Sequence, residues 1–294
     1  MKRWLSMVLV GLSMAALAQP EDAAQAEQRA KEFESKLHYQ TGSISLRDGL
    51  AQLQLPEGFR YLPPADAETV LVRWGNPPGA ETLGMIVPPK VGVTGAGSWA
   101  VVIQYQEDGY VKDSDADKID YAKLLKRMQE ATRKANAERK KQGYHEVELV
   151  GWAAPPRYDK ETHKMYWAKE LKFIGEAEHT LNYGIRVLGR RGVLVLNAVA
   201  SMGDFPLIEQ QTPEVVKMAE FSPGQRYADF NGNTDKVAAY GLAALVAGGI
   251  AAKAGFFKLL LAGLLAAKKF VIIAVIAVAA FVKRLFARKG GSTP

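Results

Sequence analysis

The stretch TLNYGIRVLGRRGVLVLNAVA, residues 180–200, decides the fold. Two β-rich runs stand on either side of the tight turn Gly189-Arg190-Arg191-Gly192, and this arrangement predicts an antiparallel hairpin. Clustered hairpins favour an α+β domain with a mainly antiparallel sheet over a parallel nucleotide-binding fold. The four strands predicted in this region cover residues 146–152, 164–173, 180–188 and 192–200.

Helices are predicted on both sides of this β region. The clearest covers residues 117–142, with apolar residues at helical spacing and Gly143 as its stop. A last short helix is predicted over 212–221, with Thr212 as N-cap and Pro213 at its first position. The remaining expected elements are an amphipathic helix at 21–40, a helix at 63–74, and strands at 43–46, 51–55, 59–62, 82–87 and 99–106. This order is similar to that of small periplasmic or lumenal sandwiches of the Mog1/PsbP type, a likeness that implies a fold and no activity.

The N-terminus has the pattern of a secretory signal. Lys2 and Arg3 precede an apolar run over 4–17, and Ala16-Leu17-Ala18 matches the small-residue pattern of a cleavage site. An uncleaved anchor is the alternative, but the run is short for a hydrocarbon layer of about 30 Å. We therefore expect residues 1–18 to be a cleaved signal peptide and residues 19–42 to be a helical lead-in.

The C-terminal part is predicted to hold the chain in a membrane. Apolar runs at 237–252, 259–267 and 270–282 alternate with lysines over 234–294. One crossing by the first run would leave Lys253 and Lys258 on the cytoplasmic side, as the positive-inside rule prefers. A hairpin in which the third run also crosses stays open, as does self-association through the small residues of the first run. Residues 43–233 would then form a periplasmic domain at the inner membrane.

Charge and composition narrow the function classes. The chain has no cysteine, which removes disulfides, thiolate nucleophiles and cysteine metal sites. Its net charge is +7, but Lys2, Arg3 and the eight basic residues after Ala252 carry ten of the positive charges, so the region between carries −3. A slightly acidic middle domain does not favour nucleic acid as a partner. The partners expected instead are the lipid bilayer and envelope or membrane proteins.

The sequence contains no strong metal, cofactor or catalytic motif. Asp229, Asn231, Asn233 and Asp235 occupy alternate places of a calcium loop, but the required glycine and glutamate are absent, so a capped turn is the preferred interpretation. The four histidines form no metal-ligand spacing. No G-x-S-x-G elbow or phosphate-binding glycine loop is present. We assign no catalytic, cofactor-binding or metal-binding residue.

Two groups of residues are candidates for weaker roles. The segment 151–158, predicted as a loop, places Trp152, Arg157 and Tyr158 among prolines, and these residue types often contact partners. Burial of Trp152 in the core is the alternative. A hydrolytic site would need Arg157, His163 and Ser201 to meet in space, which no spacing in the sequence tests.

Several short motifs are spread over the mature chain: Gly151-Trp152 with Pro156-Arg157-Tyr158, Tyr166-Trp167-Ala168-Lys169-Glu170, Asn182-Tyr183 with the turn at 189–192, and Asp235-Lys236 ahead of Tyr240-Gly241. On these motifs the chain resembles, over nearly all of its mature length, the bacterial membrane-anchored proteins of the domain of unknown function 2167 family. The resemblance implies a secreted domain tethered by C-terminal apolar helices and supplies no reaction or site residue.

The expected function is that of a membrane-anchored periplasmic binding or scaffolding module of the bacterial cell envelope. An enzymatic role is not favoured, because no motif supports one. Two alternatives stay open: an envelope hydrolase with an unrecognised polar site, and a membrane-stress protein that acts through its tail.

Overall fold

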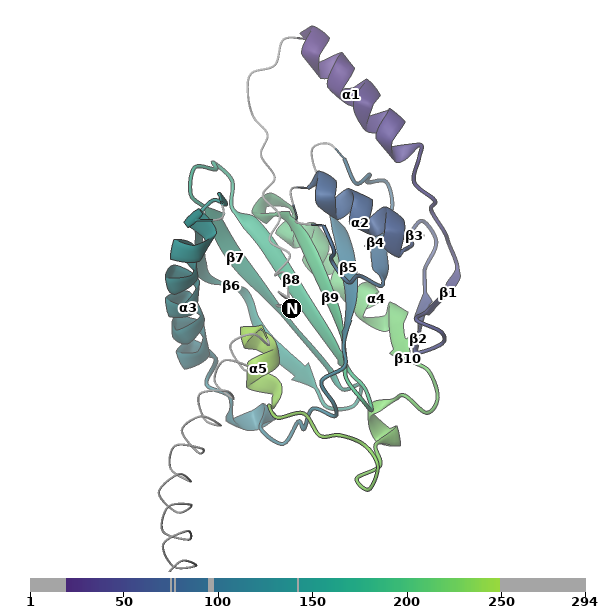
Figure 1. Cartoon of the computed structure of the whole chain (residues 1–294), viewed down its shortest axis with the longest axis vertical. Coiled ribbons are helices and arrows are strands. Elements are labelled where there is room, and N and C mark those ends of the chain that lie inside the picture. Colours follow the sequence, from purple (N-terminus) through teal and green to yellow (C-terminus); the bar gives the residue numbers. More distant parts are fainter. Residues whose placement is uncertain (1–19, 75, 77, 95–97, 142, 249–294) are drawn as a thin grey trace, which may run out of the picture. The chain divides into compact units, whose positions relative to one another are not determined.

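The computed structural model describes residues 20–74, 76, 78–94, 98–141 and 143–248. The elements follow one another along the chain as α1 (Pro20–Glu34), β1 (Ser43–Leu46), β2 (Ala51–Gln54), β3 (Arg60–Leu62), α2 (Pro64–Arg73), β4 (Gly84–Val87), β5 (Ala100–Gln106), α3 (Tyr121–Lys141), β6 (Val147–Asp159), β7 (Lys164–Phe173), β8 (Thr180–Leu188), β9 (Val193–Ser201), α4 (Phe205–Met218), β10 (Ala219–Phe221) and α5 (Leu242–Ala247). Figure 1 shows their arrangement.

The strands form two antiparallel sheets. The larger has seven strands in the order β3-β4-β5-β9-β8-β7-β6, and the smaller has three in the order β1-β2-β10. The predicted hairpin is present, with β8 and β9 paired from Thr180 opposite Ser201 to Leu188 opposite Val193. The pairing predicted between residues 82–87 and 99–106 is also confirmed, as β4 with β5. The α+β class with antiparallel sheets is therefore confirmed.

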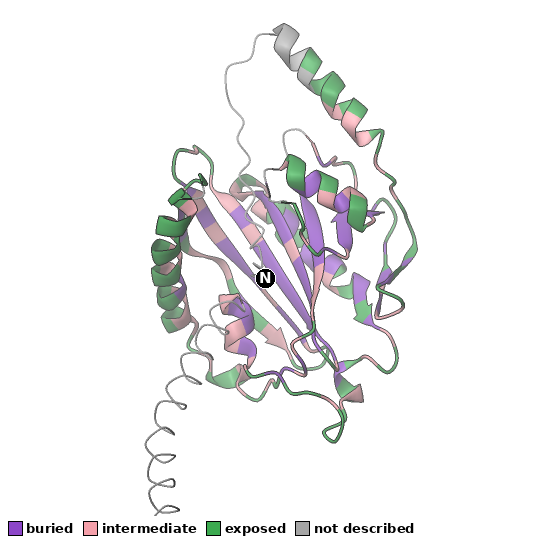
Figure 2. Ribbon diagram, viewed as in Figure 1, coloured by how far each residue is buried: buried purple, intermediate pink, exposed green. Residues whose placement is uncertain are grey.

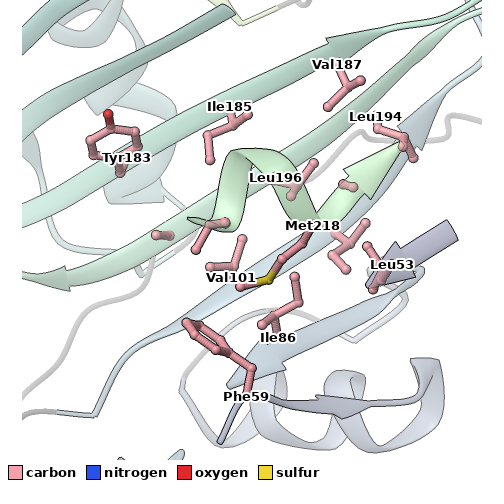
Figure 3. Packing of buried hydrophobic residues seen from close by; sticks show 14 of the residues in the cluster. Leu53, Phe59, Ile86, Val101, Tyr183, Ile185, Val187, Leu194, Leu196 and Met218 are labelled. Carbon is pink, nitrogen blue, oxygen red and sulfur yellow. The ribbon is translucent and has the colours of Figure 1, made fainter. Parts of the chain in front are cut away.

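One face of the large sheet packs on the small sheet and on α4. Alternate residues of β8 and β9, among them Tyr183, Ile185 and Leu196, project to this side and join Leu53 of β2 and Met218 of α4. Figure 3 shows these side chains meeting between the layers. We call this cluster the first core.

The opposite face of the large sheet is covered by helices. Met128 of α3 and Leu242 of α5 pack with Trp167 of β7 in a second core. Toward the other edge of the sheet, Val70 and Leu71 of α2 pack on β3, β4 and β5 in a third core. Both faces are therefore buried over most of their area, as the purple strands of Figure 2 show.

Strand β6 lies at the edge of the large sheet, and α3 covers it. The side-chain amide of Asn136 donates to the carbonyl of Val147 and accepts from its N–H, both at 2.9 Å. Gln129 donates to the carbonyl of Leu149 at 3.2 Å. An edge strand otherwise presents unpaired backbone groups, so these amides close part of the edge.

Two predicted elements need correction. Residues 151–158 are not a loop, because β6 continues to Asp159 with irregularities in its pairing near Gly151, Ala154 and Arg157. Prolines are tolerated there since β6 is an edge strand with bulges. The last long helix begins at Phe205 rather than after Thr212, whose hydroxyl instead donates to the Ile208 carbonyl one turn earlier. Residues 219–221, predicted as its end, form β10.

The described start of the first C-terminal apolar run belongs to the folded domain. Val237 forms a bridge with Tyr110, and Leu242, Leu245 and Val246 are buried in the second core. Burial against α3 therefore accounts for the apolar character of Leu242, Leu245 and Val246. Within the residues described, no helix is both long and apolar enough to cross a bilayer. The predicted signal peptide and the runs at 259–267 and 270–282 lie outside the described residues.

Candidate functional site

Polar side chains gather in the middle of the helix-covered face of the large sheet. The pairing places Lys169 opposite Asn182 on the neighbouring strand, and Asn197 opposite Gly184. Arg186 lies two residues beyond Gly184, on the same face of β8. We call the following set the sheet-face cluster: Trp167, Lys169, Asn182, Arg186 and Asn197.

Arg186 is buried, with 8% of its surface exposed. One guanidinium nitrogen, Nη1, donates to the Ile185 carbonyl at 2.8 Å and to Oδ1 of Asn197 at 3.2 Å. Its central carbon lies 4.8 Å from the centroid of the Trp167 ring, within the range of a cation–π contact. Burial lowers the pKa of Arg186 to about 9, because a charged guanidinium loses hydration there.

Lys169 is the second buried cation, with 9% of its surface exposed. Burial, and secondarily the positive charge of Arg186, lower its pKa to about 8. In the part of the chain that the structure describes, no ion pair includes Lys169 or Arg186. Two like charges are thus held in the protein interior at an energetic cost.

Trp167 adds a neutral donor to this group. Trp167 is 1% exposed, and its indole N–H has no hydrogen-bond partner among the residues that the structure describes. The ring fills the space beside Gly184, where a Cβ atom would lie 2.9 Å from the indole. Glycine is therefore required at this position for the indole to lie against the sheet.

The cluster consists mainly of hydrogen-bond donors. A lysine ammonium, the free N–H groups of a guanidinium, an indole N–H and two carboxamides suit an acceptor with negative charge. A carboxylate or a phosphate oxygen would supply both the charge and the lone pairs. The arrangement can therefore bind an anionic group.

The residues predicted as an interaction surface do not form one patch. The Trp152 indole donates to the Tyr121 carbonyl at 3.4 Å, and its ring packs on the second core beside Lys169. Arg157 is exposed, while the Tyr158 hydroxyl donates to Asp113 at 2.8 Å. Trp152 thus borders the sheet-face cluster, and for the other two residues contact with a partner stays a prediction.

The residues of the hypothetical hydrolase site are not brought together. Ser201 pairs with Thr180 at one end of β8, whereas the His163 carbonyl accepts from Leu188 at the other end. At roughly 3.3 Å per residue, the two are separated by roughly 26 Å along the strand. Nδ1 of His163 lies 3.1 Å from the Tyr158 hydroxyl and has no serine near it among the described contacts.

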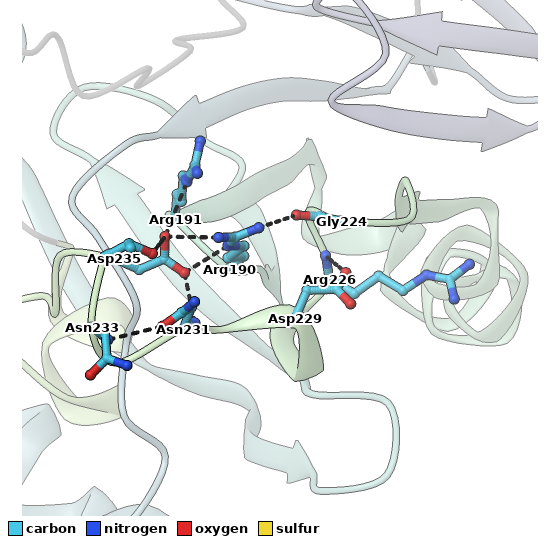
Figure 4. Close-up of polar contacts among 9 residues, drawn as sticks. Arg190, Arg191, Gly224, Arg226, Asp229, Asn231, Asn233 and Asp235 are labelled. Atoms are coloured by element: carbon cyan, nitrogen blue, oxygen red, sulfur yellow. Dashed lines mark hydrogen bonds and ion pairs between the residues drawn. The ribbon is translucent and has the colours of Figure 1, made fainter.

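The residues that resemble a calcium loop form a protein-internal ion pair instead. Asp235, whose side chain is 1% exposed, accepts from Arg190 at 2.6 Å and from the backbone N–H of Asn231 at 2.7 Å (Figure 4). Its other oxygen lies 3.4 Å from Nε of Arg191. The hydrogen bond from Arg190 is the main cause that lowers the pKa of Asp235 to about 2. The preferred interpretation as a capped turn agrees with this geometry, since guanidinium groups surround the carboxylate.

Lys169 and Arg186 were not predicted as site residues, although Lys169 lies within one of the motifs that the chain shares with the family. A signal was present in the strand alternation. On one face of β7, a single lysine interrupts the apolar series Met165, Trp167, Leu171 and Phe173.

Comparison with known proteins finds several similar solved structures and one family. Among similar solved structures is cyanobacterial PsbP from Synechocystis, with 10% identity, a TM-score of 0.35, and coverage of 63% of this chain and 92% of that one. Another is the Ran-binding protein Mog1p of Saccharomyces cerevisiae, at 8% identity and a TM-score of 0.33, covering 67% and 100%. LpqN, involved in cell envelope biogenesis of Mycobacterium tuberculosis, is 15% identical with a TM-score of 0.32 and coverage of 66% and 96%.

No curated protein matches the chain in sequence. The family model described as protein of unknown function (DUF2167) matches residues 38–279, most of the chain. The chain therefore belongs to the DUF2167 family.

Proposed function

We propose that the protein is a membrane-anchored periplasmic binding module of the bacterial cell envelope, and that its domain holds an anionic group on the sheet-face cluster. Support for the location comes from the sequence. The basic and apolar N-terminus has the pattern of a secretory signal, and the apolar runs after residue 248 have that of an anchor. A scaffolding role would use the same tether to present the domain to envelope proteins.

The observation that carries the binding role is the pair of buried cations, Lys169 and Arg186. A buried charge without an opposite charge is unfavourable, and proteins normally pair it or replace it by an apolar residue. A buried cation pair without an acidic partner among the described residues is therefore most easily explained by an anion that joins it in the functional state. The partly exposed amides of Asn182 and Asn197 would complete the contacts of that anion.

A hydrolytic function receives no support from the geometry. Ser201 and His163 lie at opposite ends of β8, and the sheet-face cluster consists mainly of hydrogen-bond donors. Binding without chemistry needs only the donors that are present. We therefore favour recognition of an anionic group over its conversion.

The test uses the full chain in detergent, freed of small anions, with inorganic phosphate and acetate as probes. We expect either probe to raise the unfolding midpoint of the wild type above that in chloride at equal ionic strength. A Lys169→Met variant should lose this difference. Lys164→Met is the matched control, since Lys164 is a buried lysine of the same strand whose Nζ donates to the Val216 carbonyl. An equal response of wild type and Lys169→Met, or no response to either probe, would contradict the proposal.

A further inference from the structure

Helix α3 carries a concentrated positive charge. Its 21 residues include eight lysines and arginines and only two glutamates, so the helix has a net charge of +6. The inner side of α3 packs Met128 and Leu124 on the second core, so the charged residues occupy the outer side. The exposed basic residues, which we call the basic face, are Lys123, Lys126, Arg127, Arg133, Lys134, Lys140 and Lys141.

The rest of the folded domain has the opposite charge. Residues 4–251 carry −3 in total, and α3 contributes +6, so the remainder carries −9. A long polyanion that wraps the domain would meet this negative surface. A flat anionic surface approached by one side of the domain would meet only the basic face. The charge distribution therefore suits a membrane surface better than a nucleic acid.

The path of the chain brings α3 close to the start of the tail. The last described helix, α5, packs against α3, with Leu242 and Leu245 in the same core as Leu124 and Leu125. Residues 248–294 follow directly in the sequence and contain the apolar and basic runs that are proposed to anchor the chain in the membrane. The described part of the chain that leads to the tail therefore lies beside α3.

We propose that the basic face of α3 docks on anionic phospholipid headgroups of the bilayer that holds the tail. This inference rests on the proposed membrane anchoring and adds a second contact to it. Lysine and arginine side chains are attracted to anionic headgroups within about one Debye length, so the docking would weaken as salt increases. The docked domain would hold a fixed orientation instead of turning freely on its tether.

The absence of cysteine allows a direct test with a single introduced thiol. Ala137 is exposed on α3, three positions from Lys134 and Lys140, and an Ala137→Cys variant would carry a fluorophore there. Thr41→Cys is the matched control, because Thr41 is exposed next to the bridge between Gln40 and Tyr61 of β3, the strand at the other edge of the sheet. The labelled full chain is placed in vesicles of phosphatidylcholine, with or without phosphatidylglycerol, that carry a headgroup quencher.

We expect quenching of the Ala137 label to increase when phosphatidylglycerol is present and to fall again in high salt, while the Thr41 label changes little. Charge reversal by Lys126→Glu and Arg133→Glu should lower the ratio of docked to free domain, by about fivefold for each cation removed. Unchanged tryptophan emission would show that these surface variants fold.

Vesicle flotation separates the two ways in which the proposal can fail. Chain that does not float with either type of vesicle would overturn the anchor and the docking together. Chain that floats, but whose Ala137 label is quenched equally in neutral and anionic vesicles, would leave the anchor supported and overturn the docking of α3.

Discussion

Replacement of Lys169 by methionine should stabilise the domain in the absence of ligand. Lysine at this position is 9% exposed and lies in a core with Trp167 and Leu171. Methionine has a similar length and no charge, so Lys169→Met keeps the packing and removes the cost of burying an ammonium group. An ordinary buried ion pair would give the opposite result, because loss of one partner leaves the other charge uncompensated.

The size of the effect follows from the pKa of Lys169. Burial and the charge of Arg186 lower this pKa from 10.5 to about 8. Each pKa unit corresponds to about 1.4 kcal/mol, so the charged form in the folded state costs about 3 kcal/mol. Below pH 8 the lysine is charged in both the folded and the unfolded protein, and burial of its charge lowers the free energy of unfolding by the full amount. Between pH 8 and 10.5 the unfolded chain binds more protons, so the free energy of unfolding rises with pH and the cost disappears.

The assay is urea unfolding of the full chain in detergent, followed by tryptophan fluorescence at a series of pH values. We expect Lys169→Met to exceed the wild type by about 3 kcal/mol at pH 7, and the difference to vanish toward pH 10.5. Titrating groups other than Arg186, whose charge interacts with that of Lys169, are common to both proteins and cancel in the difference.

Lys164→Met is the control, and it should lower the free energy of unfolding where Lys169→Met raises it. Lys164 is also buried, at 5% exposure, but its Nζ donates to the Val216 carbonyl at 2.7 Å. Burial lowers the pKa of Lys164, while the negative charges of Glu220 and Asp159 oppose this shift. Removal of the ammonium leaves a carbonyl without its donor and should cost about 1–3 kcal/mol. A destabilised Lys169→Met that keeps the pH dependence of the wild type would refute the view that its charge is unpaired.

Three further predictions address the sheet edge, the C-terminal turn and the site. Asn136→Ala removes the partner of two backbone groups of β6 and should destabilise the domain by about 1–3 kcal/mol. The exposed strand edge should also promote dimers, which size-exclusion chromatography would detect. The hydrogen bond from Arg190 lowers the pKa of Asp235 from 3.8 to about 2. This carboxylate therefore stabilises the fold above pH 3.8, and the stabilisation is lost as pH falls through 2. The free energy of unfolding of Asp235→Asn should lack this decrease in acid. Gly184→Val should displace the Trp167 indole, change its fluorescence and abolish the anion response, whereas far-UV circular dichroism should persist.

The strands of the large sheet could be predicted because their pattern is local. The turn at Gly189 and Gly192 and the β-rich runs beside it define β8 and β9 without reference to the rest of the chain. The error at β6 arose from Pro155 and Pro156, which normally end a strand. An edge position and bulges remove that restriction, and sequence alone does not show that β6 is at the edge.

The sheet-face cluster could not be predicted because it depends on register. Lys169 and Asn182 are 13 positions apart, and only the pairing of β7 with β8 brings them together. The same pairing places Gly184 opposite Trp167. A polar stripe on β8 also suggests a solvent-facing side, and the burial of Arg186 becomes visible only when both faces of the sheet are seen to be covered.

The segment that leads to the tail connects the candidate site with the proposed anchor. Carboxylates hold it to the domain: Asp235 binds Arg190, Asp108 accepts from the Tyr240 hydroxyl at 2.7 Å, and Asp115 accepts from the first backbone N–H of α5 at 3.2 Å. Tyr240 also lies close enough to Arg186 for the two groups to influence each other's pKa. One segment therefore borders the sheet-face cluster and continues into the tail. An anion bound to the cluster would offset the positive charge of Arg186 and so change the electrostatic field at Tyr240.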